Sequence, residues 1–269
     1  MDLLTLFGLL IGVGGIIFGN ALEGGHISSL FQLAAALIVF GGTFGATLMA
    51  NTWKDFRLGL RQVRQAFRSD DSQELQNLAN EIVRAAQLAR RDSILAIEAR
   101  LPYFPDPYMR HVFRFMIDGT DPNILADIFE NDLELEEERQ LAGAKIWSDA
   151  GGFAPTIGII GAVLGLIQVM ANLTDTSALG QGIAVAFVAT VYGVGSANLV
   201  FLPLASKIRR KIYRQTEMKR MVIDGAVAIL TGLNPYLIEE KVKAYTSQSM
   251  SSGKSANKMQ NKSTRAISA

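Results

Sequence analysis

The residues of this sequence that could handle an ion are one threonine and two prolines within long apolar stretches. Thr190 lies inside "AFVATVYG", where its hydroxyl either bonds back to a carbonyl of its own helix or orders water beside an ion. Pro155 and Pro203 have no backbone N–H, so each leaves one helix carbonyl without its usual donor. The two prolines are either ordinary helix-end residues or a matched pair of hinges with wetted carbonyls at a pore mouth.

Composition argues against other kinds of site. The chain has no cysteine, which excludes disulfides, thiolate metal sites and thiol nucleophiles. Its two histidines, His26 and His111, are far apart, so we interpret both as solvated or half-buried structural residues and expect neither a metal site nor a serine triad. The formal net charge is +1, and no basic stripe with interleaved aromatics indicates nucleic acid. We therefore expect neither an enzyme nor a bound cofactor.

The apolar residues, 49% of the chain, are concentrated in four uncharged runs. A helix needs about 20 residues to cross a bilayer core, and each run has about that length. The first run is preceded by Met1 and Asp2 without a basic residue, so we interpret it as a retained membrane helix and not as a signal peptide. The sequence predicts an all-α, polytopic membrane protein with four transmembrane helices and a helical cytoplasmic insert. The runs are Leu3–Leu22, Leu30–Ala50, Gly151–Leu173 and Gly182–Ala205.

Basic residues flank these runs on one side only, which predicts their direction. Five basic residues follow the second run between Lys54 and Arg68, and five follow the fourth run between Lys207 and Arg214. The short connections, residues 23–29 and 174–181, contain no Lys or Arg. Because Lys and Arg are enriched in cytoplasmic loops, both termini and the central segment are expected in the cytoplasm.

The cytoplasmic segments are expected to be mostly helical. One helix should begin at Asp71 or Ser72 and continue through Leu95 and Ile97 to the prolines of "LPYFPDP". A second should start near Tyr108, and a third near Ile124 should include the acidic "ENDLELEEERQ", which is most often a solvated face. The expected segments are residues 1–51 and 151–206 for the membrane helices, 52–150 for the cytoplasmic insert, 207–246 for a C-terminal helix, and 247–269 for a disordered tail.

The four runs contain no Asp, Glu, Lys, Arg or His. An ion relay within a membrane is ordinarily built around such a group, so any ion-carrying group must come from a partner chain. Small residues of the third run recur at steps of three and four and form one smooth helix face, against which another helix could slide or rotate. These residues are Ala154, Gly158, Gly161 or Ala162, and Gly165.

This layout, together with three motifs, resembles the A subunits of bacterial flagellar stators, the MotA/PomA family. The motifs are "ARRDSILAIEARL" in the cytoplasmic insert, "APTIGIIGAVLGLI" in the third run and "GIAVAFVATVYGVGSANLVFLPLASKI" in the fourth. The resemblance implies a pentamer of A subunits around two single-span MotB-type subunits in the inner membrane. It also implies that an aspartate of the B subunit carries the ion, and that the cytoplasmic segments push on the rotor switch protein FliG.

The resemblance also assigns roles to particular positions. Pro155 and Pro203 match the two prolines of the family, and Thr190 matches the threonine next to the ion path. Sodium-driven members carry extra hydroxyls at the positions of Ala162 and Ala189; alanine has no oxygen ligand for a hard cation, so the resemblance favours H+ as coupling ion. Arg90 and Glu98 match the charged pair that faces the rotor, with Arg91 as the alternative to Arg90; eight residues apart, they are expected on similar faces of one helix.

Three alternatives remain open at this point. The ExbB/TolQ group also surrounds a partner's aspartate helix, but its subunits have three spans and an outside N-terminus. A sodium-driven PomA-type stator would share the whole layout. A non-conducting scaffold, in which the glycine faces serve assembly alone, would not depend on Thr190. An enzyme is disfavoured because the sequence has no nucleophile motif, metal cluster or phosphate loop.

Overall fold

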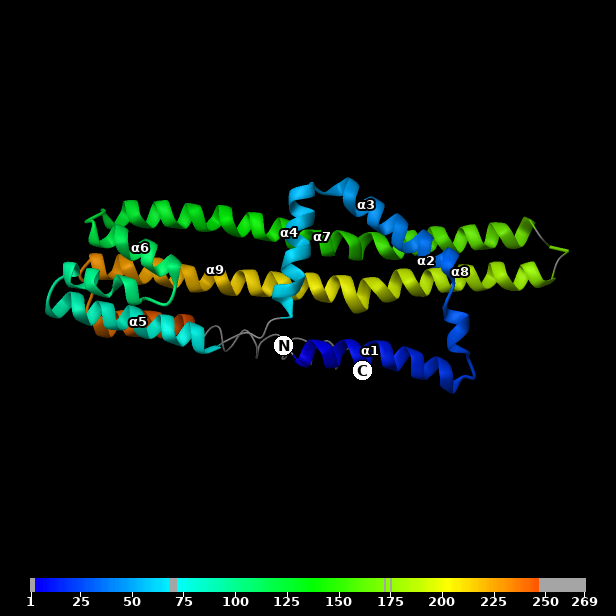
Figure 1. Cartoon of the computed structure of the whole chain (residues 1–269), viewed down its shortest axis with the longest axis horizontal. Helices are drawn as coiled ribbons and strands as arrows, with labels where there is room; N and C mark the ends of the chain where they lie inside the picture. Colours follow the sequence, from blue (N-terminus) through cyan, green and yellow to red (C-terminus); the bar gives the residue numbers. More distant parts are fainter. Residues whose placement is uncertain (1–2, 68–71, 172, 175, 247–269) are drawn as a thin grey trace, which may run out of the picture. The chain divides into compact units, whose positions relative to one another are not determined.

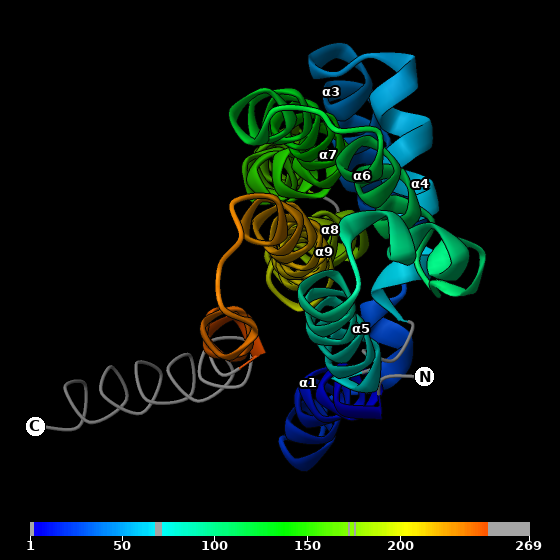
Figure 2. The ribbon, with the colours of Figure 1, turned by 90° about the vertical axis from the view of Figure 1, so that its left-hand side faces the viewer.

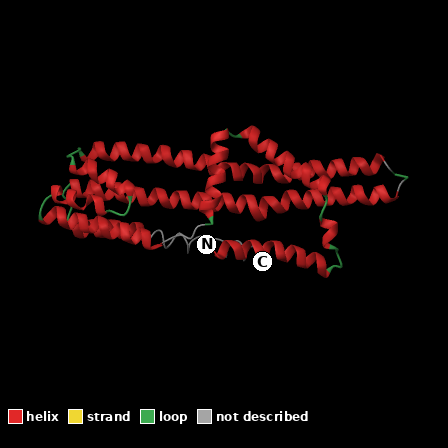
Figure 3. Ribbon diagram, viewed as in Figure 1, coloured by secondary structure: helices red, strands yellow, loops and turns green. Residues whose placement is uncertain are grey.

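The computed structural model describes residues 3–67, 72–171, 173–174 and 176–246, and within these ranges the protein is helical without a strand (Figure 3). This confirms the all-α fold; the disorder expected of residues 247–269 lies outside the described residues. Segments η1 and η3 are 3-10 helices, whereas η2 and η4 are π-helical. The elements are α1 (Leu3–Leu22), η1 (Ile27–Leu30), α2 (Leu33–Ala36), η2 (Leu37–Gly41), α3 (Gly42–Ala50), α4 (Trp53–Ala66), α5 (Ser72–Arg91), η3 (Ile94–Tyr103), α6 (Pro107–Ile117), α7 (Pro122–Ala171), α8 (Thr176–Ser196), η4 (Ala197–Phe201), α9 (Leu202–Leu230) and a last helical segment over residues 235–246 (Figure 1).

The chain forms two compact units. Unit 1 comprises Met1–Ser69 and Arg139–Lys211, and unit 2 comprises Asp70–Glu138 and Ile212–Ala269. Helices α7 and α9 contribute to both units. The limits of the two units reflect how the residues pack and differ from the expected membrane boundaries. The segment limits derived from the sequence therefore stay predictions.

Three helical segments of the described residues are long and apolar enough to cross a membrane: Ile27–Ala50, and parts of Pro122–Ala171 and Leu179–Leu230. The N-terminal helix α1 coincides with the first apolar run, and Phe7–Leu22 within it forms a shorter apolar helical stretch. Large apolar side chains on these segments are exposed, as is usual where lipid replaces water as the surrounding medium. Examples are Leu10, Ile11, Phe18, Leu37, Ile159, Ile167 and Phe187.

The acidic stretch and the third apolar run form one unbroken helix, α7. Asp121 begins it, because its Oδ1 accepts hydrogen bonds from the N–H groups of Asn123 at 2.9 Å and Ile124 at 3.3 Å. The helix is already formed at Gly151, so Pro155 lies in its interior and not in its first turn, and the interpretation of Pro155 as an ordinary helix-end residue is wrong. The acidic stretch consists mostly of good helix formers such as Leu, Glu and Arg, which gives the helix no reason to stop.

Unit 2 has the larger buried apolar core. The core is built from α5, η3, α6, the first turns of α7, the last turns of α9 and the last helical segment. Phe104 and Phe113 meet edge to face with ring centroids 5.3 Å apart, and Gly225 of α9 packs directly on Ile82 of α5. Tyr245 of the last helical segment donates a hydrogen bond to Asp224, and burial raises the pKa of this tyrosine.

Candidate functional site

The two proline segments lie next to each other within unit 1. A Cβ placed on Gly151 of α7 would lie 2.5 Å from Cδ2 of Leu202, the residue that precedes Pro203. Gly151 is also the residue whose carbonyl would bond to the N–H of position 155, which Pro155 lacks. Pro155 is half-buried and Pro203 exposed. The structure thus brings together the segments of both prolines, as the antiparallel order of the runs predicts.

A π-helical segment, Ala197–Phe201, precedes Pro203. There the N–H of Leu202 bonds to the carbonyl of Ala197, five residues back. A proline ring clashes with the carbonyl four residues before it, here that of Leu199, and a wider turn relieves this clash. The helix therefore continues through Pro203 into α9 without a break. The sequence patterns do not predict this π-helical segment. Pro203 is the residue that could have indicated it.

The smooth face of α7 is covered by α8 of the same chain. A Cβ added to Gly161 would lie 2.7 Å from the Cβ of Ala189, and one added to Gly165 would lie 2.8 Å from the carbonyl oxygen of Gly182. In return, a Cβ on Gly193 would lie 2.5 Å from the carbonyl oxygen of Ala154. The two backbones are in direct contact, so these glycines are unavailable to a helix of a partner chain.

The three positions that the resemblance links to an ion path differ in their surroundings. Ala189 has 0% of its surface exposed because it packs on Gly161, whereas Ala162 is half-buried and Thr190 is exposed at the surface of the chain. The Thr190 hydroxyl donates to the carbonyl oxygen of Ala186 at 3.3 Å, which is the bond within its own helix. An exposed hydroxyl held in this way still presents its oxygen lone pairs to whatever lies against α8.

A polar cluster that the sequence did not reveal ties the second apolar segment to α7. Oδ2 of Asp149 accepts hydrogen bonds from Lys145 Nζ at 2.7 Å and from Asn51 Nδ2 at 3.0 Å. Asn51 also donates to the carbonyl of Thr47 at 3.0 Å. The spacing of Lys145 and Asp149 could have indicated their helical ion pair, but nothing in the sequence connects either to Asn51. The cluster lies six residues before Pro155 on α7.

Arg90 and Glu98 do not share a helix, contrary to expectation. Helix α5 ends at Arg91, Ser93 is extended with φ 175° and ψ 170°, and Glu98 belongs to the 3-10 helix η3. Asp and Ser compete for backbone hydrogen bonds with their own side chains, which favours a break at "DS". Arg90 and Glu98 are both exposed, and neither has an ion-pair partner among the described residues.

Arg91 differs from Arg90 in having a local partner. Its guanidinium donates to both oxygens of Asp92, with Nη2 to Oδ2 at 2.9 Å. This hydrogen bond raises the pKa of Arg91 and lowers the pKa of Asp92. Because its charge is balanced, Arg91 is less suited than Arg90 to bind an acidic partner.

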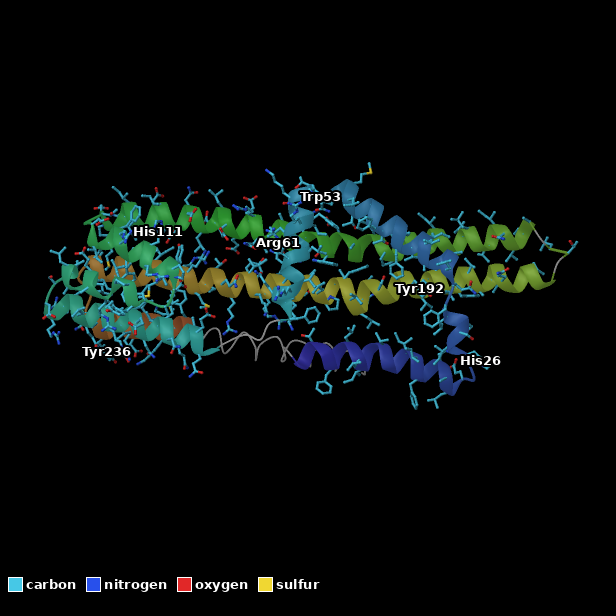
Figure 4. All side chains as sticks on the ribbon, viewed as in Figure 1. His26, Trp53, Arg61, His111, Tyr192 and Tyr236 are labelled. Atoms are coloured by element: carbon cyan, nitrogen blue, oxygen red, sulfur yellow. The ribbon has the colours of Figure 1, made fainter. Side chains whose placement is uncertain are left out.

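The histidines and one tyrosine have structural surroundings (Figure 4). His26 precedes the 3-10 helix η1 in extended conformation, and His111 lies edge-on to Phe115 and Phe129 at 5.3 and 5.4 Å. The Tyr192 hydroxyl donates to the carbonyl of Leu30, where the second apolar segment interrupts its helix. The residues that the structure describes contain no group of three His, Asp or Glu placed to hold a metal.

Comparison with known proteins identifies the family. Residues 6–89 match the model of the Motility protein A N-terminal region, and residues 102–221 match that of the MotA/TolQ/ExbB proton channel family. Motility protein A of Bacillus subtilis is 32% identical over 245 residues, which cover 91% of this chain and 91% of that protein. The chain belongs to the MotA/PomA family of flagellar stator A subunits. This confirms the resemblance noted in the sequence.

Other members of the MotA/PomA family show how fully the chain matches it. Chemotaxis protein PomA of Vibrio alginolyticus is also 32% identical, covering 92% of this chain and 96% of PomA. The solved structure of C. jejuni MotAB superposes with a TM-score of 0.84 at 27% identity, covering 91% of this chain and 96% of that chain. The flagellar MotAB stator complex from Bacillus subtilis gives 0.80 at 32% identity, covering 88% and 92%.

Proposed function

We propose that this chain is the A subunit of a proton-driven flagellar stator, which forms an ion channel with a MotB-type partner and turns ion flow into torque. The observation that carries the proposal is the combination of a match to MotAB structures over about nine-tenths of the chain with apolar runs that contain no ionisable residue. A chain with such runs needs a partner's carboxylate to carry the ion. In this arrangement, five copies surround the partner helices.

In this proposal α1 also crosses the membrane, together with the three long apolar segments. Its 20 residues are long enough to cross the core of a bilayer, and the basic residues that follow α3 and η4 fit a cytoplasmic location for both termini. The protein then lies in the bacterial inner membrane. Pro155 and Pro203 would mark the cytoplasmic mouth of the ion path, where the contact between Gly151 and Leu202 joins their segments.

We propose H+ as the coupling ion. The overall identity does not discriminate, because Motility protein A of Bacillus subtilis and PomA are both 32% identical to the chain. The half-buried side chain of Ala162 has no oxygen that could replace a water of a sodium ion. Ala189 has none either, and its complete burial leaves an oxygen there little access to an ion.

The function is tested by replacing Thr190 with alanine in the complete stator. We expect membrane-inserted complexes in normal amount. Swimming speed should fall at least tenfold, because a barrier to ion transfer that is higher by about 1.4 kcal/mol slows the transfer tenfold. Thr231→Ala is the control: it removes an exposed hydroxyl that also bonds four residues back, to Val227 at 2.9 Å, but outside the apolar runs. Normal swimming with Thr190→Ala would favour a scaffold. Motor speed that follows the sodium gradient at constant proton-motive force would overturn the choice of ion.

Arg90 and Glu98 are proposed to contact FliG on the rotor. The double charge reversal Arg90→Glu with Glu98→Lys should abolish swimming in soft agar while stator levels stay normal, since both side chains are exposed and make no ion pair within the described residues. Reversal of acidic and basic residues on the rotor partner should restore part of the motility. Arg91→Glu should be milder. If Arg91→Glu proves the more harmful change, the contact belongs to Arg91.

A further inference from the structure

Helix α4 follows the second apolar segment and lies across the direction of α7 and α8 (Figures 1 and 2). Thr52 begins it, because its Oγ1 accepts a hydrogen bond from the N–H of Asp55 at 3.3 Å. Where α7 and α8 cross a bilayer along their length, α4 must run in the plane of the membrane. Its position directly after the second span puts it at the cytoplasmic surface.

One side of α4 is held against α7. Gly59 and Gln62 are buried, and Gln62 Nε2 donates to the main-chain oxygen of Gln140 at 2.9 Å. Trp147 Nε1 donates to the carbonyl of Gly59 at 3.1 Å. These contacts fix the rotation of α4 about its own axis. The other sides of the helix therefore point in defined directions.

A second side of α4 is apolar and exposed. With 3.6 residues per turn, one side of the helix carries Trp53, Phe56 and Leu60. The side chains of Trp53 and Leu60 are 63% and 59% exposed. Trp53 stacks on Phe56 with ring centroids 5.6 Å apart, and Phe56 meets the exposed Phe44 of α3 edge-on at 5.7 Å. The exposed apolar surface of the second span thus continues onto α4 without interruption.

A third side, next to the apolar one, carries four basic residues, all exposed: Lys54, Arg57, Arg61 and Arg64. Figure 4 labels Arg61 among them. Asp55 is the single acidic residue in the helix, and its carboxylate accepts a hydrogen bond from Thr52 Oγ1 at 2.6 Å. When the apolar side enters the hydrocarbon boundary, the long Lys and Arg stems bring their charges to the depth of the lipid phosphates.

We propose that this exposed surface of α4 binds anionic phospholipid headgroups of the cytoplasmic leaflet, with the four basic side chains on phosphodiester oxygens. Guanidinium groups pair with phosphate through two parallel hydrogen bonds, and each basic residue near an anionic leaflet strengthens the attraction to that leaflet about fivefold. An acidic protein surface would match the charges but would leave Trp53 and Leu60 without an apolar contact. The inference requires the chain to lie in a membrane, and it is independent of whether the chain conducts ions.

The test uses the complete stator complex in nanodiscs of phosphatidylcholine with phosphatidylglycerol as a minor component. Two preparations are compared: in one the phosphatidylglycerol has brominated chains, and in the other the phosphatidylcholine has them. Bromine quenches tryptophan fluorescence at contact, and subtracting the signal of a Trp53→Phe complex isolates Trp53. We expect brominated phosphatidylglycerol to quench Trp53 several-fold more than random mixing predicts. The variant Arg57→Gln with Arg61→Gln removes two of the four basic side chains, so this excess should fall by at least half while quenching by brominated phosphatidylcholine rises.

The matched control is Arg110→Gln with Arg114→Gln, which removes another exposed pair of arginines four residues apart, from α6 of unit 2. This control should leave the excess unchanged. Equal quenching by both lipids in the native complex would overturn the preference for anionic headgroups, and no quenching by either would overturn the membrane contact. A change in subunit stoichiometry without a change in quenching would mean that the basic side binds an acidic protein surface, which also overturns the proposal.

Discussion

Replacing Gly193 by alanine should remove most of the folded stator from the membrane and abolish swimming. The new Cβ would lie 2.5 Å from the carbonyl oxygen of Ala154 and 3.0 Å from Cα of Gly158. Both are backbone atoms of α7, so neither can yield without separating α7 from α8. Overpacking of this kind costs about 1–3 kcal/mol and sometimes more. Immunodetection of the membrane-inserted chain and swimming in soft agar measure the effect.

Gly195 provides the matched control on the same helix. A Cβ at this position would have nothing within 4 Å, and alanine favours a helix over glycine by about 1 kcal/mol. Gly195→Ala should therefore assemble at least as well as the native chain. If both substitutions reduce the membrane-inserted chain equally, the cause is a surface of α8 that a partner covers and not the contact of α7 with α8. Normal assembly of Gly193→Ala would contradict the close approach of the two helices.

Leu125→Ala should destabilise unit 2 by about 2–5 kcal/mol, which is the usual cost of a cavity at a fully buried leucine. Leu125 lies in the first turns of α7 with 0% of its surface exposed, among the core residues of this unit. A loss of this size is a large part of the 5–15 kcal/mol that holds a typical domain together. Hydrogen exchange of α6 amides in the stator complex should accelerate by more than tenfold, and the segments proposed to contact the rotor should lose their function.

Leu135 offers the same substitution on the same helix without the cavity. Its side chain is 59% exposed, so Leu135→Ala should leave hydrogen exchange in α6 within about a factor of two, as surface substitutions usually cost under 0.5 kcal/mol. If both variants accelerate exchange equally, the effect comes from the helix as a whole and not from burial at Leu125.

The sequence alone was sufficient for features that depend on composition along one helix. The apolar runs, their lack of ionisable groups and the end of α1 at Leu22 could be derived directly, because burial in lipid selects apolar residues over a fixed length. The motifs led to the correct family. Helix ends were less reliable: α7 has no break near Gly151, whereas α5 ends before Glu98, since local preferences at "DS" outweigh a continuing apolar pattern.

Only the tertiary structure decided what each helix face meets. Periodicity showed that Gly158, Gly161 and Gly165 share a face, but it could not say that α8 of the same chain fills it. Ala189 and Thr190 are neighbours in sequence, yet one is fully buried and the other exposed, because successive helix positions point about 100° apart. The link from Asn51 to Asp149 spans 98 residues. Such a contact depends on how separate helices pack, and no pattern within one helix specifies it.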